Sequence, residues 1–143
     1  MKSYLPVSVI IPSFNSKLTI YRAVQSIIEQ SSMPREVIII DDASEDRKPQ
    51  NDYLRKIDLI LKKKFIKTII IKNKINKGPA FSRNKGWEYA TQKFLAFLDA
   101  DDAWAKNKLN FQFNFMKNNN KIDVTCHDTK FLSNNKKIEH NVE

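Results

Sequence analysis

Four short runs of β-branched and other apolar residues alternate with segments of helical periodicity, and this alternation constrains the fold more than any other feature. The runs predict buried strands at residues 7–11, 37–40, 68–71 and 94–98. The segments beside them predict helices over residues 15–30, 49–64, 79–90 and 105–117. Strands that alternate with helices favour right-handed crossovers. We therefore expect an α/β domain with a Rossmann-like, mostly parallel sheet covered by helices on both faces.

Local signals refine the expected elements. Pro12 is expected to end the first strand, and Asn15 or Ser16 is expected to cap the first helix. The helix that begins at Pro79 is expected to bury one apolar face, formed by Ala80, Trp87 and Ala90. Residues 122–132 have the composition of a further strand, and a polar tail is expected over about 133–143.

Length and charge limit the classes of function. The 143 residues fit a single domain over 1–143, and 25 Lys+Arg against 16 Asp+Glu give a net charge of +9. The basic residues are spread along the chain, which favours a solvated surface over a nucleic-acid site, so no nucleic-acid partner is expected. A basic module for nucleic acid or anionic membrane remains an alternative. The single Cys126 cannot form an internal disulfide.

No apolar run approaches the roughly 18 residues of a membrane-spanning helix. The chain is accordingly expected to be cytoplasmic or peripheral to the inner face of a membrane.

Polar residues follow each predicted strand, which places five aspartates at one rim of a parallel sheet: Asp41, Asp42, Asp99, Asp101 and Asp102. Three carboxylates within residues 99–102 repel one another, and such a group favours a bound cation. On an extended backbone Asp99 and Asp101 would point the same way. Their oxygens are suitable ligands for Mn²⁺ or Mg²⁺, which also take water and substrate phosphates.

The segment 76–86 contains both glycines of the chain, Gly78 and Gly86, and starts a helix. Arg83 could pair with a phosphate or with a rim carboxylate, and Asn84 could brace the acidic loop. An exposed arginine on a surface helix would explain the same pattern.

Together these pieces resemble the N-terminal half of a family 2 glycosyltransferase with the GT-A fold. The matching segments are residues 7–15, 40–44, 76–86 and 97–104, in the order of the family. The resemblance implies nucleotide-binding roles for Pro12, Phe14, Asn15, Asp41, Asp42, Gly78, Arg83 and Asp99. It implies a divalent metal site, for Mn²⁺ or Mg²⁺, at Asp99, Asp101 and Asp102. It also implies a nucleotide-sugar donor, with a UDP-sugar favoured, a saccharide or lipid-linked acceptor, and an inverting reaction.

Family members normally continue further, with an acceptor site and a carboxylate base. The chain is therefore expected to be a truncated domain that binds a nucleotide but does not transfer sugar. The late titratable residues match no catalytic motif and stay unassigned: Asp123, His127, Asp128, Glu139 and His140. An uncovered sheet edge would favour a homo-oligomer.

A haloacid-dehalogenase-like phosphatase is a second enzyme alternative, because residues 97–101 also resemble the Asp-x-Asp loop of that family. In that family, however, the loop normally follows the first strand.

Overall fold

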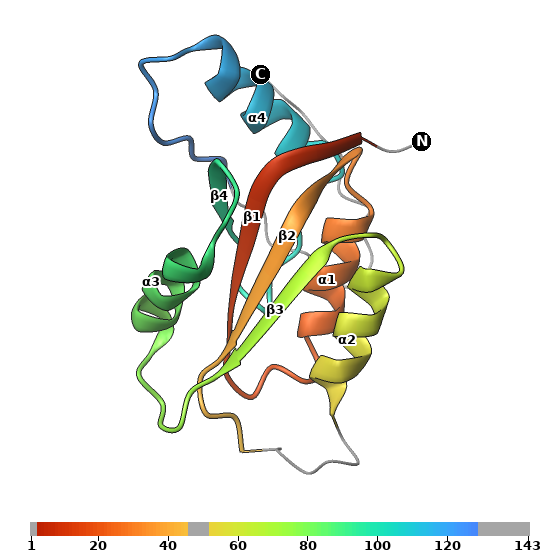
Figure 1. Cartoon of the computed structure of the whole chain (residues 1–143), viewed down its shortest axis with the longest axis vertical. Helices are drawn as coiled ribbons and strands as arrows, with labels where there is room; N and C mark the ends of the chain where they lie inside the picture. The colour runs from red at the N-terminus through yellow and green to blue at the C-terminus, as the bar shows by residue number, and fades with distance from the viewer. Residues whose placement is uncertain (1–2, 46–51, 129–143) are drawn as a thin grey trace.

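The computed structural model describes residues 3–45 and 52–128, which form one parallel sheet with helices on both faces (Figure 1). The strands are β1 (Ser3–Ser13), β2 (Ser32–Asp41), β3 (Lys67–Lys72) and β4 (Phe94–Phe97). The helices are α1 (Ile20–Ile28), α2 (Tyr53–Lys62), α3 (Pro79–Tyr89) and α4 (Lys108–Asn118). The strand order is β3-β2-β1-β4, and every neighbouring pair is parallel. The expected α/β fold class is confirmed.

Alternate residues of the central strands face opposite layers, as the two-residue period of a strand requires. Val9 and Val37 belong to the larger core, which also takes in the apolar faces of α1 and α2. Ile10, Ile38 and Ile40 form a smaller core on the other face, where α3 packs against the sheet (Figure 1). Both faces of β1 and β2 are therefore buried, which explains their nearly continuous apolar sequence.

Helix α3 approaches the sheet through small residues, and the expected apolar face is wrong. Its buried residues are Ser82 and Gly86, whereas Trp87 is 61% exposed. A Cβ atom added at Gly86 would lie 2.4 Å from Cγ2 of Ile10 in β1. The missing side chain at this position is what lets the helix backbone lie so close to the strand.

Several predicted boundaries also differ. Pro12 lies inside β1 rather than ending it. The N-cap of α1 is Thr19 rather than Asn15 or Ser16, because the Asn15 side chain accepts a hydrogen bond from the distant Glu45 N–H at 2.9 Å. Residues 122–128 contain no strand. The rest of the expected strand, residues 129–132, and the expected polar tail lie outside the described residues.

The topology creates a switch point between β1 and β4. From β1 to β3 the chain moves stepwise in one direction with α1 and α2 on one face, and α3 then crosses the other face to place β4 on the opposite side of β1. In open parallel sheets such a point opens a crevice beyond the carboxyl ends of the strands. The loops after β1 and β4 meet there.

A buried carboxylate links the strands at the end of the sheet opposite the switch point. Glu36 of β2 is fully buried and accepts hydrogen bonds from Ser8 Oγ, Lys67 Nζ, and the N–H and hydroxyl of Thr91, at 2.5 to 2.9 Å. Burial opposes its ionisation, but the hydrogen bonds from Lys67, Ser8 and Thr91 prevail and lower the pKa of Glu36 to about 2. Glu36 thereby joins three strands and the loop before β4.

Candidate functional site

The acidic loop that follows β4 begins at the switch point. Leu98 N–H donates to the Ile10 carbonyl at 3.1 Å, which extends the contact of β4 with β1, and Asp99 comes next. The loop then turns, with a hydrogen bond from Asp102 N–H to the Asp99 carbonyl at 3.1 Å. The extended backbone expected for Asp99 to Asp101 is therefore wrong. The turn separates a half-exposed Asp99 from the exposed Asp101 and Asp102.

Two arginines from opposite faces of the sheet hold the acidic loop. Arg83 of α3 forms an ion pair with Asp99, with 2.5 Å between Nη2 and Oδ1. This is the second of the two partners expected for Arg83, a rim carboxylate. Arg22 of α1 donates a hydrogen bond to the backbone carbonyl of Asp101. The loop is thus fixed through one carboxylate and one carbonyl, which leaves the other carboxylates available.

Those remaining carboxylates face solvent. In residues 3–45 and 52–128, the carboxylates of Asp101 and Asp102 make no hydrogen bond or ion pair within the protein. Across the same residues, no cluster of three or more His, Cys, Asp or Glu side chains could hold a metal ion. The donor set therefore fits Mg²⁺ or Mn²⁺ bound by one or two carboxylates and completed by water and phosphate. It does not fit a metal held by the protein alone.

The loops after β1 and β2 are joined by three hydrogen bonds. Asp42 N–H donates to the Ser13 carbonyl at 2.8 Å, Asn15 N–H donates to Ser44 Oγ at 2.9 Å, and Asn15 Oδ1 accepts from Glu45. Asn15 has a positive φ of 51°, which asparagine tolerates better than most residues. Asn15 therefore ties the loop after β1 to the loop after β2.

Asp41 and Asp42 are both 2% exposed and both contact the backbone. Asp41 Oδ1 accepts from Ser44 N–H at 3.1 Å. The Asp42 carboxylate accepts from Asn73 Nδ2 at 2.7 Å and from Gly78 N–H at 2.7 Å, and both of its oxygens accept from Lys77 N–H. Asp42 thus holds the start of α3, the helix that carries Arg83, against the end of β2.

Gly78 is the residue at which this arrangement depends on glycine. It is the N-cap of α3 with a φ of 86°, in the region that L side chains rarely adopt.

Phe14, just beyond β1, is 46% exposed, whereas Pro12 is buried in the strand. Of the residues expected to contact a nucleotide, Phe14 and Asn15 are exposed and Gly78, Arg83 and Asp99 are partly exposed. Pro12, Asp41 and Asp42 are buried.

Two polar residues that the sequence reasoning missed support the rim. Lys85 Nζ donates to Asn73 Oδ1 at 2.6 Å and so braces the amide that contacts Asp42. Arg22 comes from a helix 79 residues away from the loop it binds. The Asn84 side chain is exposed and makes no hydrogen bond within the described residues, so the bracing role expected for it is wrong. The neighbour Lys85 takes part in the network instead.

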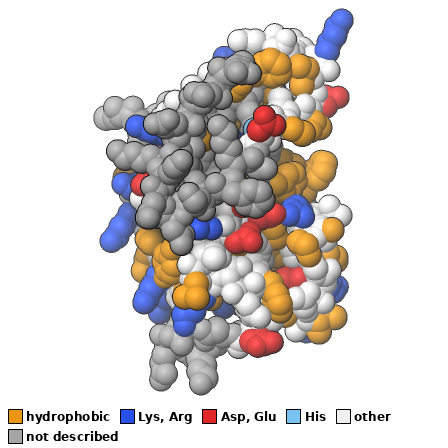
Figure 2. Space-filling model, turned by 180° about the vertical axis from the view of Figure 1, so that it is seen from behind, with side chains coloured by type: hydrophobic (Ala, Val, Ile, Leu, Met, Phe, Trp, Pro, Cys, Tyr) orange, Lys and Arg blue, Asp and Glu red, His pale blue; other side chains and the backbone are white. Residues whose placement is uncertain are grey.

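The model of the family described as "Glycosyl transferase family 2" matches residues 8–142. The chain belongs to this family. The match covers part of β1, all of β2, β3 and β4, and the acidic loop, which agrees with the fold and argues against a phosphatase of the haloacid-dehalogenase type. On the face shown in Figure 2, visible Lys and Arg side chains lie at separate places among hydrophobic and acidic ones.

Curated relatives include named glycosyltransferases. The chain is 35% identical over 135 residues to the Escherichia coli UDP-Glc:alpha-D-GlcNAc-diphosphoundecaprenol beta-1,3-glucosyltransferase WfgD, covering 94% of this chain and 49% of the relative. It is 40% identical over 110 residues to the putative teichuronic acid biosynthesis glycosyltransferase TuaG of Bacillus subtilis, covering 77% of this chain and 41% of that protein. The chain therefore spans about half the length of these relatives or less.

Solved structures give the same architecture. TarS 1-349 of S. aureus in complex with UDP matches with a TM-score of 0.68 at 26% identity, over 81% of this chain and 33% of that one. The mannosyltransferase PcManGT from Pyrobaculum calidifontis, in complex with GDP-Man and Mn²⁺, matches with a TM-score of 0.67 at 26% identity, over 78% and 32% of the two chains.

No helix among residues 3–45 and 52–128 is long and apolar enough to cross a membrane.

Proposed function

We propose that this chain binds a UDP-sugar at the crevice between β1 and β4 and serves its transfer to a saccharide or lipid-linked acceptor. The acidic loop carries the proposal, because one of its carboxylates is tied to Arg83 while Asp101 extends free into solvent. The UDP complex of TarS and the UDP-Glc donor in the name of WfgD support this choice of nucleotide.

The base and the diphosphate of the donor would contact different side chains. Phe14 offers an exposed ring at the rim for the base, and a carboxylate at Asp42 could accept a hydrogen bond from a base N–H. Because Asp42 already accepts from Asn73, Lys77 and Gly78, base binding would exchange one of these donors. Asp99, held by Arg83, would contact the ribose. Arg83 also brings a fixed positive charge to the rim, where a diphosphate would gain from it.

A divalent cation fits the same loop. Asp101, with Asp99 or Asp102, would hold Mn²⁺ or Mg²⁺ together with the diphosphate oxygens, as expected for an ion that takes few protein ligands. Such an ion would supply Lewis-acid stabilisation of the negative charge that develops on the departing diphosphate. The Mn²⁺ in the PcManGT complex supports this assignment.

A thermal-shift panel tests the proposal. UDP with Mn²⁺ should raise the melting temperature more than GDP, ADP or UMP with Mn²⁺, and more than UDP with EDTA. Ligand stabilisation grows with the ratio of ligand concentration to Kd, so the ranking of shifts reports the ranking of affinities. An equal shift for all four nucleotides, or a UDP shift unaffected by EDTA, would contradict the proposed donor and metal.

A further inference from the structure

An open groove of about 490 Å³ lies beside α4 at the start of β2, away from the acidic loop. Its lining combines Ser31, Phe111 and Phe115 with asparagines at positions 107, 110, 114 and 118. The groove is held in place by the Ser31 N–H, which donates to the Lys106 carbonyl at 2.8 Å. It contains none of the residues assigned to the donor.

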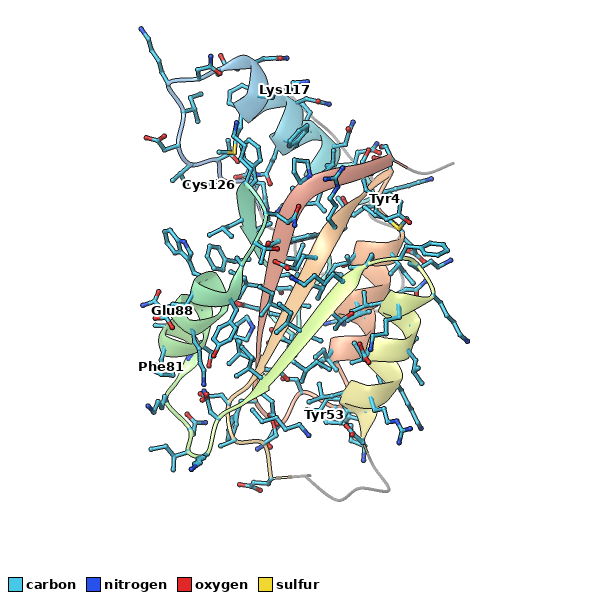
Figure 3. The ribbon with its side chains drawn as sticks, in the orientation of Figure 1. Tyr4, Tyr53, Phe81, Glu88, Lys117 and Cys126 are labelled. Atoms are coloured by element: carbon cyan, nitrogen blue, oxygen red, sulfur yellow. The ribbon has the colours of Figure 1, made fainter. Side chains whose placement is uncertain are left out.

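Among residues 3–45 and 52–128, the lining carries no charged side chain. A groove for nucleic acid or phosphate would need Lys or Arg to offset the charge of its ligand, and α4 places Lys117 outside this lining. In Figure 3 the Lys117 label marks this helix, at the opposite end of the molecule from Tyr53. The charge balance therefore favours an uncharged ligand.

The two phenylalanines expose apolar surface on one side of α4. Phe111 is 58% and Phe115 is 45% exposed, and a spacing of four residues puts both rings on the same side of the helix. Their neighbour Phe113 instead packs edge-on against Phe94 in the core, with ring centroids 5.3 Å apart. Exposed flat rings gain free energy when a ligand with an apolar face covers them.

The amides offer hydrogen bonds beside these rings. Asn110 Oδ1 accepts from Asn114 Nδ2 and from Ser32 Oγ, both at 3.3 Å, which leaves Nδ2 of Asn110 and Oδ1 of Asn114 unused. Asn118 has no side-chain hydrogen bond within the described residues. Ser31 Oγ, in the lining, is buried without a hydrogen-bond partner. Each amide pairs a donor with an acceptor, which suits the neighbouring hydroxyls of a sugar ring.

We propose that this groove binds an uncharged saccharide through ring stacking on Phe111 and Phe115 and amide hydrogen bonds. It lies at the amino end of β2, whereas Asp42 and the donor crevice lie at the carboxyl ends of the strands (Figure 1). Ten residues of strand separate the two, or about 33 Å at 3.3 Å per residue. The groove therefore holds a part of the saccharide remote from the reacting hydroxyl and raises its local concentration. As a role in glycosyl transfer, this inference rests on the proposed function.

Nuclear magnetic resonance titration with maltoheptaose, a neutral pyranose oligomer, tests the site without UDP or metal. Side-chain amide signals of Asn110, Asn114 and Asn118 should shift, and Phe111→Ala should weaken binding about tenfold, equivalent to about 1.4 kcal/mol. Phe65→Ala is the matched control, because Phe65 is 87% exposed and lies after α2, outside the groove. Raising the salt from about 50 to about 300 mM should leave the affinity unchanged, since no charge is involved.

Three results would overturn the inference. One is the absence of shifts at millimolar maltoheptaose, and another is equal binding by Phe111→Ala and wild type. The third is a concentration-dependent dimer that Phe111→Ala abolishes, which would make the groove an interface between copies of this chain. The UDP response separates the two proposals: Phe111→Ala should retain the thermal shift with UDP and Mn²⁺. Absence of maltoheptaose binding in wild type, with the UDP shift intact, therefore rejects the groove, while absence of the UDP shift in wild type rejects the proposed donor.

Discussion

The contact between Gly86 and Ile10 predicts that Gly86→Ala destabilises the protein, although alanine is the better helix former. The added Cβ would lie 2.4 Å from Ile10 Cγ2 and 3.3 Å from Cγ1, whereas carbon atoms in contact are normally about 3.5 to 4.0 Å apart. Ile10 is fully buried in β1, so it cannot turn aside into solvent. The helix must therefore back away from the sheet by about 1 Å to restore an ordinary contact.

The magnitude follows from two opposing effects. Overpacking a core costs about 1 to 3 kcal/mol, and replacing glycine by alanine in a helix returns about 1 kcal/mol. The expected net loss is about 1 kcal/mol in the free energy of unfolding, measured by urea denaturation. Arg83 lies on the same helix, so the shift should also loosen its ion pair with Asp99 and weaken UDP binding.

Ser82→Ala is the matched control, since Ser82 lies four residues earlier on the same buried face. Its Oγ is buried without a hydrogen-bond partner, so this change should be neutral or stabilising. In the double variant with Ile10→Ala, the overlap disappears, so the cost of Gly86→Ala should vanish. A Gly86→Ala variant that is more stable than wild type would refute the close-packing argument.

Two further predictions concern the buried carboxylates. Because the pKa of Glu36 falls from 4.5 to about 2 on folding, its contribution of about 3 kcal/mol is complete above pH 4.5 and is lost as the pH decreases towards 2. Urea denaturation across this range should show the loss in wild type and a smaller one in Glu36→Gln, and equal slopes would contradict it. Asp42→Ala should lower stability and weaken UDP binding in calorimetry, each by about 1 to 3 kcal/mol, because it removes the carboxylate that accepts from Asn73, Lys77 and Gly78. Unchanged UDP affinity with an intact fold would remove Asp42 from the donor site.

The sequence was sufficient for the strand cores and for the polar rim at their carboxyl ends, and insufficient for the strand order and the element ends. Runs such as residues 37–40 are predictable because their burial on both faces requires continuous apolar residues. The start of α1 was not predictable, because the Asn15 side chain accepts a hydrogen bond from Glu45, a residue 30 positions away, instead of capping the helix. Local signals do not reveal such a competing long-range partner.

The buried face predicted for helix α3 was wrong for a different reason. The large apolar side chain of Trp87 favoured it as a buried residue. The contact with β1 is instead made by Ser82 and Gly86, whose small size permits close approach. Small residues four apart opposite a strand of isoleucines could have indicated this packing. Within the site, the sequence indicated a rim carboxylate as one of two possible partners of Arg83, without specifying Asp99. Arg22 and Lys85 become visible only when the loops are placed in space.

The most direct test of the central claim is isothermal titration of UDP into wild type, Asp101→Asn and Asp102→Asn, each with Mn²⁺ and with EDTA. Wild type should bind UDP tightly with Mn²⁺, and Asp101→Asn should lose this metal dependence. The metal-free fold should be unchanged or stabilised, because the substitution removes a charge from an exposed acidic loop. Full metal-dependent UDP binding by Asp101→Asn, or unfolding of that variant without metal, would place the donor site elsewhere.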